Sequence, residues 1–100
     1  MLKHVVMWRF QNEAEGNTKD TNMTILKGLL EALPAEIPQI QLMQVGRDIV
    51  HNTSSFDMGL VSEFADQEAL DQYVVHPAHQ KVSQFASKVI AERATLDFLF

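Results

Sequence analysis

The amino-acid sequence predicts an α+β fold in which one four-stranded antiparallel sheet carries two helices on a single face. Segments with the two-residue alternation of strands and segments with helical periodicity follow one another in the order β-α-β-β-α-β. The three prolines fall at the boundaries of these segments or at a break within one. The chain has 100 residues, of which 46% are hydrophobic, so we expect one domain, residues 1–100, with one core.

The first predicted strand covers residues 2–11. One alternate set of its side chains is almost wholly apolar, and the other set is mixed. The apolar set consists of Leu2, His4, Val6, Trp8 and Phe10. A strand with this pattern suits a sheet that is covered by helices on one side. The polar residues 11–18, which include Gly16 and Asn17, predict a loop.

A helix is predicted after this loop, with Thr18, Asp20 or Thr21 as its N-cap. Its apolar positions recur at helical spacing and form one stripe, which consists of Met23, Leu26, Leu29, Leu30 and Leu33. Pro34 and Pro38 end the helix, because proline cannot continue it.

Two further strands are predicted at residues 40–50 and 56–64. Ile40 and Leu42 share one face of the earlier strand, whereas Met43 and Val45 share the other. The alternate apolar positions of the later strand are Phe56, Met58 and Leu60. The polar residues between the two strands form turns readily, so the strands should pair as a hairpin.

A second helical region follows and is interrupted at His76-Pro77. Asp66 is a suitable N-cap for its first part, and Glu68 in the first turn is favoured by the helix dipole. Pro77 is well placed as the first residue of the continuing helix, with His76 as its cap. Residues 95–100 are the last predicted strand. The apolar positions that share a face there are Ala94, Leu96, Phe98 and Phe100.

This order of elements is that of the ferredoxin-like fold. With both helices on one face, the other face of the sheet stays open, and we expect apolar residues on it. These residues are Val5, Met7, Met43, Val45 and Val61. An exposed apolar surface of this kind is unusual on a monomer. A homodimer that closes sheet against sheet would cover it.

Charge and composition exclude several classes of function. Eight Lys and Arg residues stand against thirteen Asp and Glu residues, and the net charge of −5 argues against nucleic acid and anionic membranes as partners. The absence of cysteine excludes disulfides, thiolate metal sites and a cysteine nucleophile. The longest apolar run, residues 5–8, is far shorter than the roughly 18 residues of a membrane span. Lys3, His4 and Arg9 interrupt any signal-peptide core, so a cytoplasmic protein is expected.

Residues 73–79, Tyr-Val-Val-His-Pro-Ala-His, are the most informative segment for chemistry. In a regular helix Tyr73 and His79 would lie on different sides, but the break at Pro77 redirects the second half. The two side chains can then converge over the sheet, and His4 on the apolar face of the first strand can point to the same space. A His/Tyr group beside an apolar cavity suits proton transfer to and from a carbonyl compound.

A structural role stays open for each of these residues. His4 suits a core histidine, Tyr73 a core side chain and His76 a helix cap. His76 and His79 have the i, i+3 spacing of metal ligands, but no third ligand accompanies them, so no metal is expected. The sequence has no glycine-rich phosphate loop, nucleophile elbow or obvious carboxylate pair, and no cofactor is expected.

The chain resembles the stress-responsive dimeric α/β-barrel family over essentially its whole length. The resemblance is carried by residues 3–10, Lys-His-Val-Val-Met-Trp-Arg-Phe, and by two later segments, 64–66 and 73–79. The Tyr-x-x-His-Pro-x-His pattern is the more specific of these motifs. Membership implies a ferredoxin-like protomer that pairs into a homodimeric barrel.

One branch of this family, the plant polyketide cyclases, is similar across the His-Pro-Ala-His segment. These enzymes close a linear polyketide by a cofactor-free intramolecular aldol condensation. The resemblance places their catalytic His and Tyr on His79 and Tyr73 and a pocket His on His4. A further pocket His falls on Met58, where this sequence departs from the pattern. Some relatives bind Mg²⁺ through backbone carbonyls, which would fall near Leu30, Leu33 and Glu36.

Three functions therefore stay open. The first is cyclase-type chemistry, with His79 as the base, Tyr73 as the acid and a pocket for a small apolar carbonyl compound. We expect the pocket to be lined by His4, Val6, Trp8, Leu26, Leu29, Met58, Leu60 and Phe85. The second is a non-catalytic stress or ligand-binding dimer. The third, known among other dimeric α/β barrels, is a cofactor-independent monooxygenase, for which Trp8 is the relevant residue. A cavity of at least about 300 Å³ that reaches His79 would favour a small-molecule site.

Overall fold

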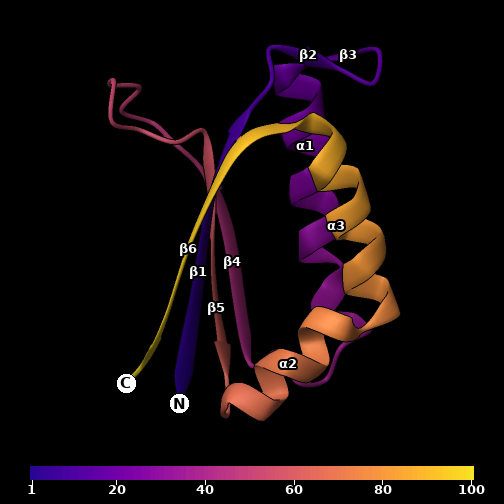
Figure 1. The fold of residues 1–100 in the computed structure, drawn as a ribbon, viewed down its shortest axis with the longest axis vertical. Coiled ribbons are helices and arrows are strands. Elements are labelled where there is room, and N and C mark those ends of the chain that lie inside the picture. Colours follow the sequence, from indigo (N-terminus) through magenta and orange to yellow (C-terminus); the bar gives the residue numbers. More distant parts are fainter.

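A four-stranded antiparallel sheet forms one layer of the structure, and all three α-helices lie on one of its faces (Figure 1). The computed structural model covers residues 1–100, and the strands are ordered β4-β5-β1-β6 in the sheet. The strands are β1 (Leu2–Phe10), β4 (Leu42–Arg47), β5 (Met58–Phe64) and β6 (Ile90–Leu99). The helices are α1 (Lys19–Glu31), α2 (Gln67–Val75) and α3 (Pro77–Val89), with a short 3-10 helix η1 (Leu33–Ala35) after α1. This arrangement confirms the predicted ferredoxin-like fold.

Two elements differ from the prediction. The segment expected to be a loop contains a small hairpin of β2 (Glu13–Ala14) and β3 (Asn17–Thr18). Its turn residues, Glu15 and Gly16, both have positive φ, as a tight two-residue hairpin turn requires. The last strand begins at Ile90 instead of residue 95, because β6 pairs along the whole length of β1.

All three helices begin at capping residues that the sequence predicted, and for α1 the cap is Thr18, one of three candidates. The Thr18 hydroxyl caps α1 by accepting a hydrogen bond from the Thr21 amide, at 3.3 Å. Asp66 caps α2 through the Ala69 amide, at 2.9 Å. The His76 ring caps α3 through the Ala78 amide, at 3.1 Å. Each cap satisfies an amide that has no partner within its helix.

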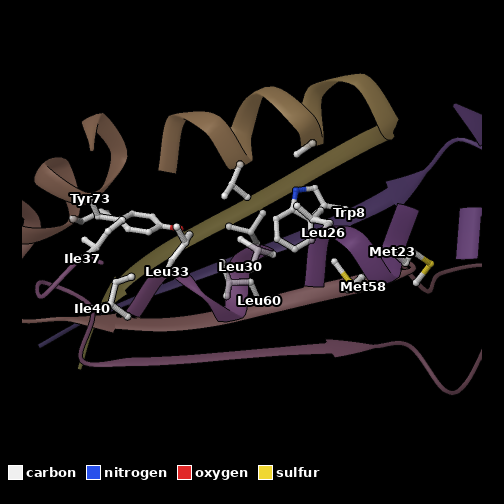
Figure 2. Close-up of a cluster of buried hydrophobic side chains, with 14 of the residues drawn as sticks. Trp8, Met23, Leu26, Leu30, Leu33, Ile37, Ile40, Met58, Leu60 and Tyr73 are labelled. Atoms are coloured by element: carbon white, nitrogen blue, oxygen red, sulfur yellow. The ribbon is translucent and has the colours of Figure 1, made fainter. Parts of the chain in front are cut away.

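The core lies between the sheet and the helices (Figure 2). The predicted inward set of β1, Leu2, His4, Val6, Trp8 and Phe10, is buried throughout. From α1, Leu26 and Leu30 face this core, since residues four apart lie on one side of a helix. Leu29 does not belong to the buried stripe, because it lies toward the outside of α1 and is 38% exposed.

The open face of the sheet carries an apolar patch, but the predicted composition of this patch is wrong at two positions. Met43 pairs with Ser62 and Val45 with Leu60, so both side chains face the helices. Leu42 takes a place on the open face instead, because the pairing of β4 with β5 decides which face each residue occupies. The apolar residues on the open face are Val5, Met7, Leu42, Val61, Leu96 and Phe98.

None of the helices has the length and apolar character that crossing a membrane requires.

The Asp66 cap gives a prediction for stability. Asp66→Ala removes the acceptor for the Ala69 amide and should lower the free energy of unfolding by about 1 kcal/mol, measured by urea denaturation. Asp71→Ala is the matched control, because Asp71 is exposed within the same helix and makes no hydrogen bond or ion pair. An equal loss in both variants would contradict a capping role for Asp66.

Candidate functional site

A cavity of about 340 Å³ lies between the sheet and the helices. Its walls are mostly apolar and come from β1, α1, β5, α2, α3 and β6. The apolar wall includes Val6, Trp8, Leu26, Leu30, Leu60 and Val82, and the principal polar residues are His4, Tyr73, His79 and Arg93. No Asp or Glu side chain lines the cavity. The site therefore combines an apolar space with histidine, tyrosine and arginine side chains.

The predicted lining is partly correct. Five of the eight residues expected around the pocket line this cavity, namely His4, Val6, Trp8, Leu26 and Leu60, and three do not. Leu29 faces away from it, and Met58 fills the core next to Met23 (Figure 2). Phe85 packs against the core from the side, because Val82 and Ala86 occupy the inward face of α3.

Tyr73 is positioned by α2 and is 1% exposed, with its hydroxyl pointing along the sheet in the direction of Trp8 (Figure 2). The hydroxyl makes no hydrogen bond within the protein, and it is not fully occluded, since it opens onto the cavity. A buried tyrosine hydroxyl ordinarily finds a partner. Burial raises the pKa of Tyr73 to about 12, partly opposed by the charge of Arg93. Tyr73 therefore stays protonated and can donate a hydrogen bond to a ligand.

His79 lies in the first turn of α3, and its Nδ1 is 3.0 Å from the carbonyl oxygen of Val74 in α2. A carbonyl oxygen can only accept, so Nδ1 carries the proton and Nε2 of the neutral ring has a free lone pair. Burial lowers the pKa of His79, and the positive fields of His4, Arg93 and His76 act in the same direction, while the Val74 bond opposes them. His79 is thus available as a neutral base near pH 7.

The rings of Tyr73 and His79 are in contact, with centroids 4.3 Å apart and planes inclined by 47°. The break at His76-Pro77 makes this contact possible, because α3 takes a new direction after α2 (Figure 1). The His4 ring also lies near Tyr73, at 6.3 Å between centroids, and its Nδ1 donates to the carboxylate of Asp97. His76 caps α3 and does not line the cavity.

Sequence reasoning missed eight of the fifteen lining residues, among them Arg93 and Leu30. Leu30 could have been found from its i+4 relation to Leu26. Arg93 had no such signal, because the last strand was expected to begin after it. In the sheet Arg93 pairs with Trp8, and this register places it on the helix-covered face beside the cavity.

The Mg²⁺ site implied for some relatives does not fit the segment after α1. The carbonyl oxygen of Leu33 accepts hydrogen bonds from the amides of Glu36 and Ile37, both at 2.9 Å. A carbonyl oxygen has two lone pairs, so both are engaged. The protein has no group of three or more His, Asp or Glu side chains that could hold a metal ion.

The fold and the cavity together define a class of proteins: ferredoxin-like α/β-barrel subunits with a His/Tyr pair between sheet and helices. The model of the stress-responsive A/B barrel domain matches residues 2–100, and the chain belongs to this family. It is 28% identical over 98 residues to the uncharacterized protein SCO4036 of Streptomyces coelicolor, covering 92% of this chain and 97% of that relative.

Solved structures show the same fold. A dimeric protein of unknown function from Bacteroides fragilis is 28% identical, with a TM-score of 0.86 over 99% of this chain and 95% of that chain. The hydroxynitrile lyase from Passiflora edulis has a TM-score of 0.85 at 12% identity, covering 99% and 92%. An antibiotic biosynthesis monooxygenase has a TM-score of 0.74 at 16% identity, covering 100% and 98%. The last two likenesses concern the fold alone.

The lowered pKa of His79 predicts a dependence of stability on pH. The unfolded chain takes up a proton on this ring near pH 6.5, whereas the folded protein does so only at lower pH. Stability should therefore be fully present above about pH 6.5 and fall as the pH drops below it. Urea denaturation between about pH 7.5 and about pH 5.5 should show a steeper loss for the wild type than for His79→Gln. Parallel curves for the two proteins would contradict the lowered pKa.

Proposed function

We propose that this protein binds a small apolar carbonyl compound and catalyses cofactor-free proton transfer, with His79 as the base and Tyr73 as the acid. The observation that carries the proposal is the cavity of about 340 Å³ that reaches both side chains. It exceeds the roughly 300 Å³ expected of a small-molecule site. The Tyr73 hydroxyl has no partner in the protein, so a ligand oxygen can serve as its acceptor.

Nε2 of His79 would remove a proton from the carbon next to a carbonyl group. The electron pair of the broken C–H bond moves into the carbonyl, and the resulting enolate oxygen accepts a hydrogen bond from Tyr73. The enolate carbon can then attack a second carbonyl carbon of the same molecule and close a ring. The new alkoxide takes back the proton from the His79 imidazolium, so the reaction needs no oxidant, reductant or metal.

The contacts of the site support these roles. The bond from Nδ1 of His79 to Val74 holds the ring and directs Nε2 away from the backbone of α2. The contact between the rings of His79 and Tyr73 supports their acting together on one carbonyl group. His4, held by Asp97, also lines the cavity and would orient the substrate or the tyrosine.

Two other functions use the same cavity. A non-catalytic dimer that stores or senses an apolar ligand would need the cavity but no proton transfer. A cofactor-independent monooxygenase would use Trp8, whose indole N–H has no hydrogen-bond partner within the protein. Oxygen uptake with a quinol-type substrate would favour the monooxygenase, and ligand binding without turnover would favour the non-catalytic protein.

We further propose that the chain works as a homodimer in which two open sheet faces pack together. The open face carries Leu96, 61% exposed, together with Met7 and Phe98. Exposed apolar surface of this extent favours a protein partner. The 28% identical protein from Bacteroides fragilis is described as dimeric, which supports a second copy of this chain as the partner.

The catalytic proposal predicts the effects of two substitutions. His79→Ala should lower turnover of linear polyketide mimics or β-diketones by about 10²–10⁴-fold, since general base catalysis contributes that much. Tyr73→Phe should lower it by about 10²–10³-fold through loss of the donor to the enolate. Product formation is followed by chromatography and mass spectrometry.

His51→Asn is the matched control, because His51 lies in an exposed loop outside the cavity. Asn also tolerates the positive φ of His51. Unchanged turnover in His79→Ala would remove His79 from the mechanism, and no turnover by the wild type across the panel would argue against catalysis.

The dimer predicts a molecular mass of twice the 11.3 kDa chain by sedimentation at micromolar concentration. Leu96→Asp should shift the protein toward the monomer, because a carboxylate in a sheet-to-sheet interface is costly to bury. Val75→Asp is the control, since Val75 is equally exposed but lies on α2, away from the open face. A monomeric wild type, or a dimer that tolerates Leu96→Asp, would refute this arrangement.

A further inference from the structure

Arg93 has no partner in the protein, although it lines the cavity. The chain has three arginines. Arg9 binds Glu92 at 2.6 Å and Arg47 binds Asp20 at 2.7 Å, but Arg93 makes no ion pair and no side-chain hydrogen bond. The protein carries a net charge of −5, so acidic residues are plentiful elsewhere. An unpaired cation beside an apolar cavity can offer a counter-charge to an anionic ligand.

The register of the sheet directs Arg93 to the site. Arg93 pairs with Trp8, whose side chain is buried on the helix-covered face. Arg93 itself is exposed, so it stands where the cavity meets solvent. Arg93 lines the same cavity as Tyr73 and His79, and its positive charge acts to lower the pKa of both groups.

The acidic residues near Arg93 are engaged elsewhere. Glu92 pairs with Arg9 on the opposite face of the sheet, and Asp97, on the same face as Arg93, binds His4. No acidic side chain lines the cavity. The guanidinium therefore has all its donors available to a bound molecule.

We propose that the cavity takes an apolar oxo acid and that Arg93 binds its carboxylate at the mouth. This inference deepens the proposed function, because the carbonyl group of the same molecule would lie toward Tyr73 and His79. The planar guanidinium matches the two oxygens of a carboxylate, which it binds through parallel hydrogen bonds. A phosphate carries more charge and would call for a second cationic side chain, and the cavity is lined by no lysine and by no arginine other than Arg93.

The arrangement defines the order of groups along the ligand. The carboxylate lies at the solvent-exposed end beside Arg93, and the apolar body lies against Trp8 and the α1 leucines. The carbonyl lies within reach of the unpartnered Tyr73 hydroxyl. An ester or a neutral ketone of the same shape would fill the apolar part but leave Arg93 without a counter-charge.

Calorimetry with matched ligand pairs tests this inference. The probes are benzoylpropionate and its methyl ester, and an unbranched aliphatic oxo acid and its methyl ester. The wild type should bind at least one acid more tightly than its ester, by about tenfold or more. Arg93→Gln should remove this preference while leaving affinity for the ester unchanged, and Arg93→Lys should restore part of it.

Arg9→Gln is the matched control, because Arg9 lies on the opposite face of the sheet and does not line the cavity. It should keep the preference for the acid. Three results would overturn the inference. The wild type could bind acid and ester with equal affinity, or it could bind neither acid measurably. The Arg93→Gln variant could also lose as much affinity for the ester as for the acid.

These results can be told apart from a failure of the proposed catalysis. Binding of the acid through Arg93 without any turnover would leave the inference standing and refute proton transfer. Turnover that depends on His79 but is the same in Arg93→Gln, for acid and ester alike, would refute the role of Arg93 and leave proton transfer standing.

Discussion

The break between α2 and α3 is the constraint on which the candidate site depends. Pro77 cannot donate the amide hydrogen that would continue α2, and the His76 ring caps the helix that starts there. Because α3 then runs in a new direction, His79 reaches back to the Val74 carbonyl and lies against Tyr73. A continuous helix would point these side chains about 120° apart around its axis. The proposed acid and base are adjacent because the helix is broken.

Burial gives the two groups complementary protonation states. It raises the pKa of Tyr73 to about 12 and lowers the pKa of His79, so the tyrosine keeps its proton and the imidazole stays neutral. The same low-polarity surroundings thus keep a donor and an acceptor side by side without ionising either. Arg93 adds a positive field that would favour an enolate or a carboxylate over a neutral molecule. Sites that separate protonation states in this way suit acid–base chemistry near neutral pH.

Much of the fold could be predicted from local patterns. Alternation identified β1, and the capping residues Thr18, Asp66 and His76 marked the starts of the helices. These signals depend on residues close together in the chain. The faces of β4 could not be predicted in the same way, since strand pairing decides them, and Met43 and Val45 were assigned to the wrong side. The early start of β6 likewise depends on pairing with β1.

The sequence by itself determined the order of the elements, the broken helix and the His/Tyr segment, because turn, capping and proline chemistry act locally. Only the tertiary structure decided which apolar side chains line the cavity and which pack elsewhere. Leu30 lines it while Leu29, Met58 and Phe85 do not, since helix rotation and side-chain packing settle these positions. Arg93 enters the site because the strand register pairs it with Trp8, which lies near the other end of the sequence. No local pattern encodes such a contact, because it arises from hydrogen bonds between the two ends of the chain.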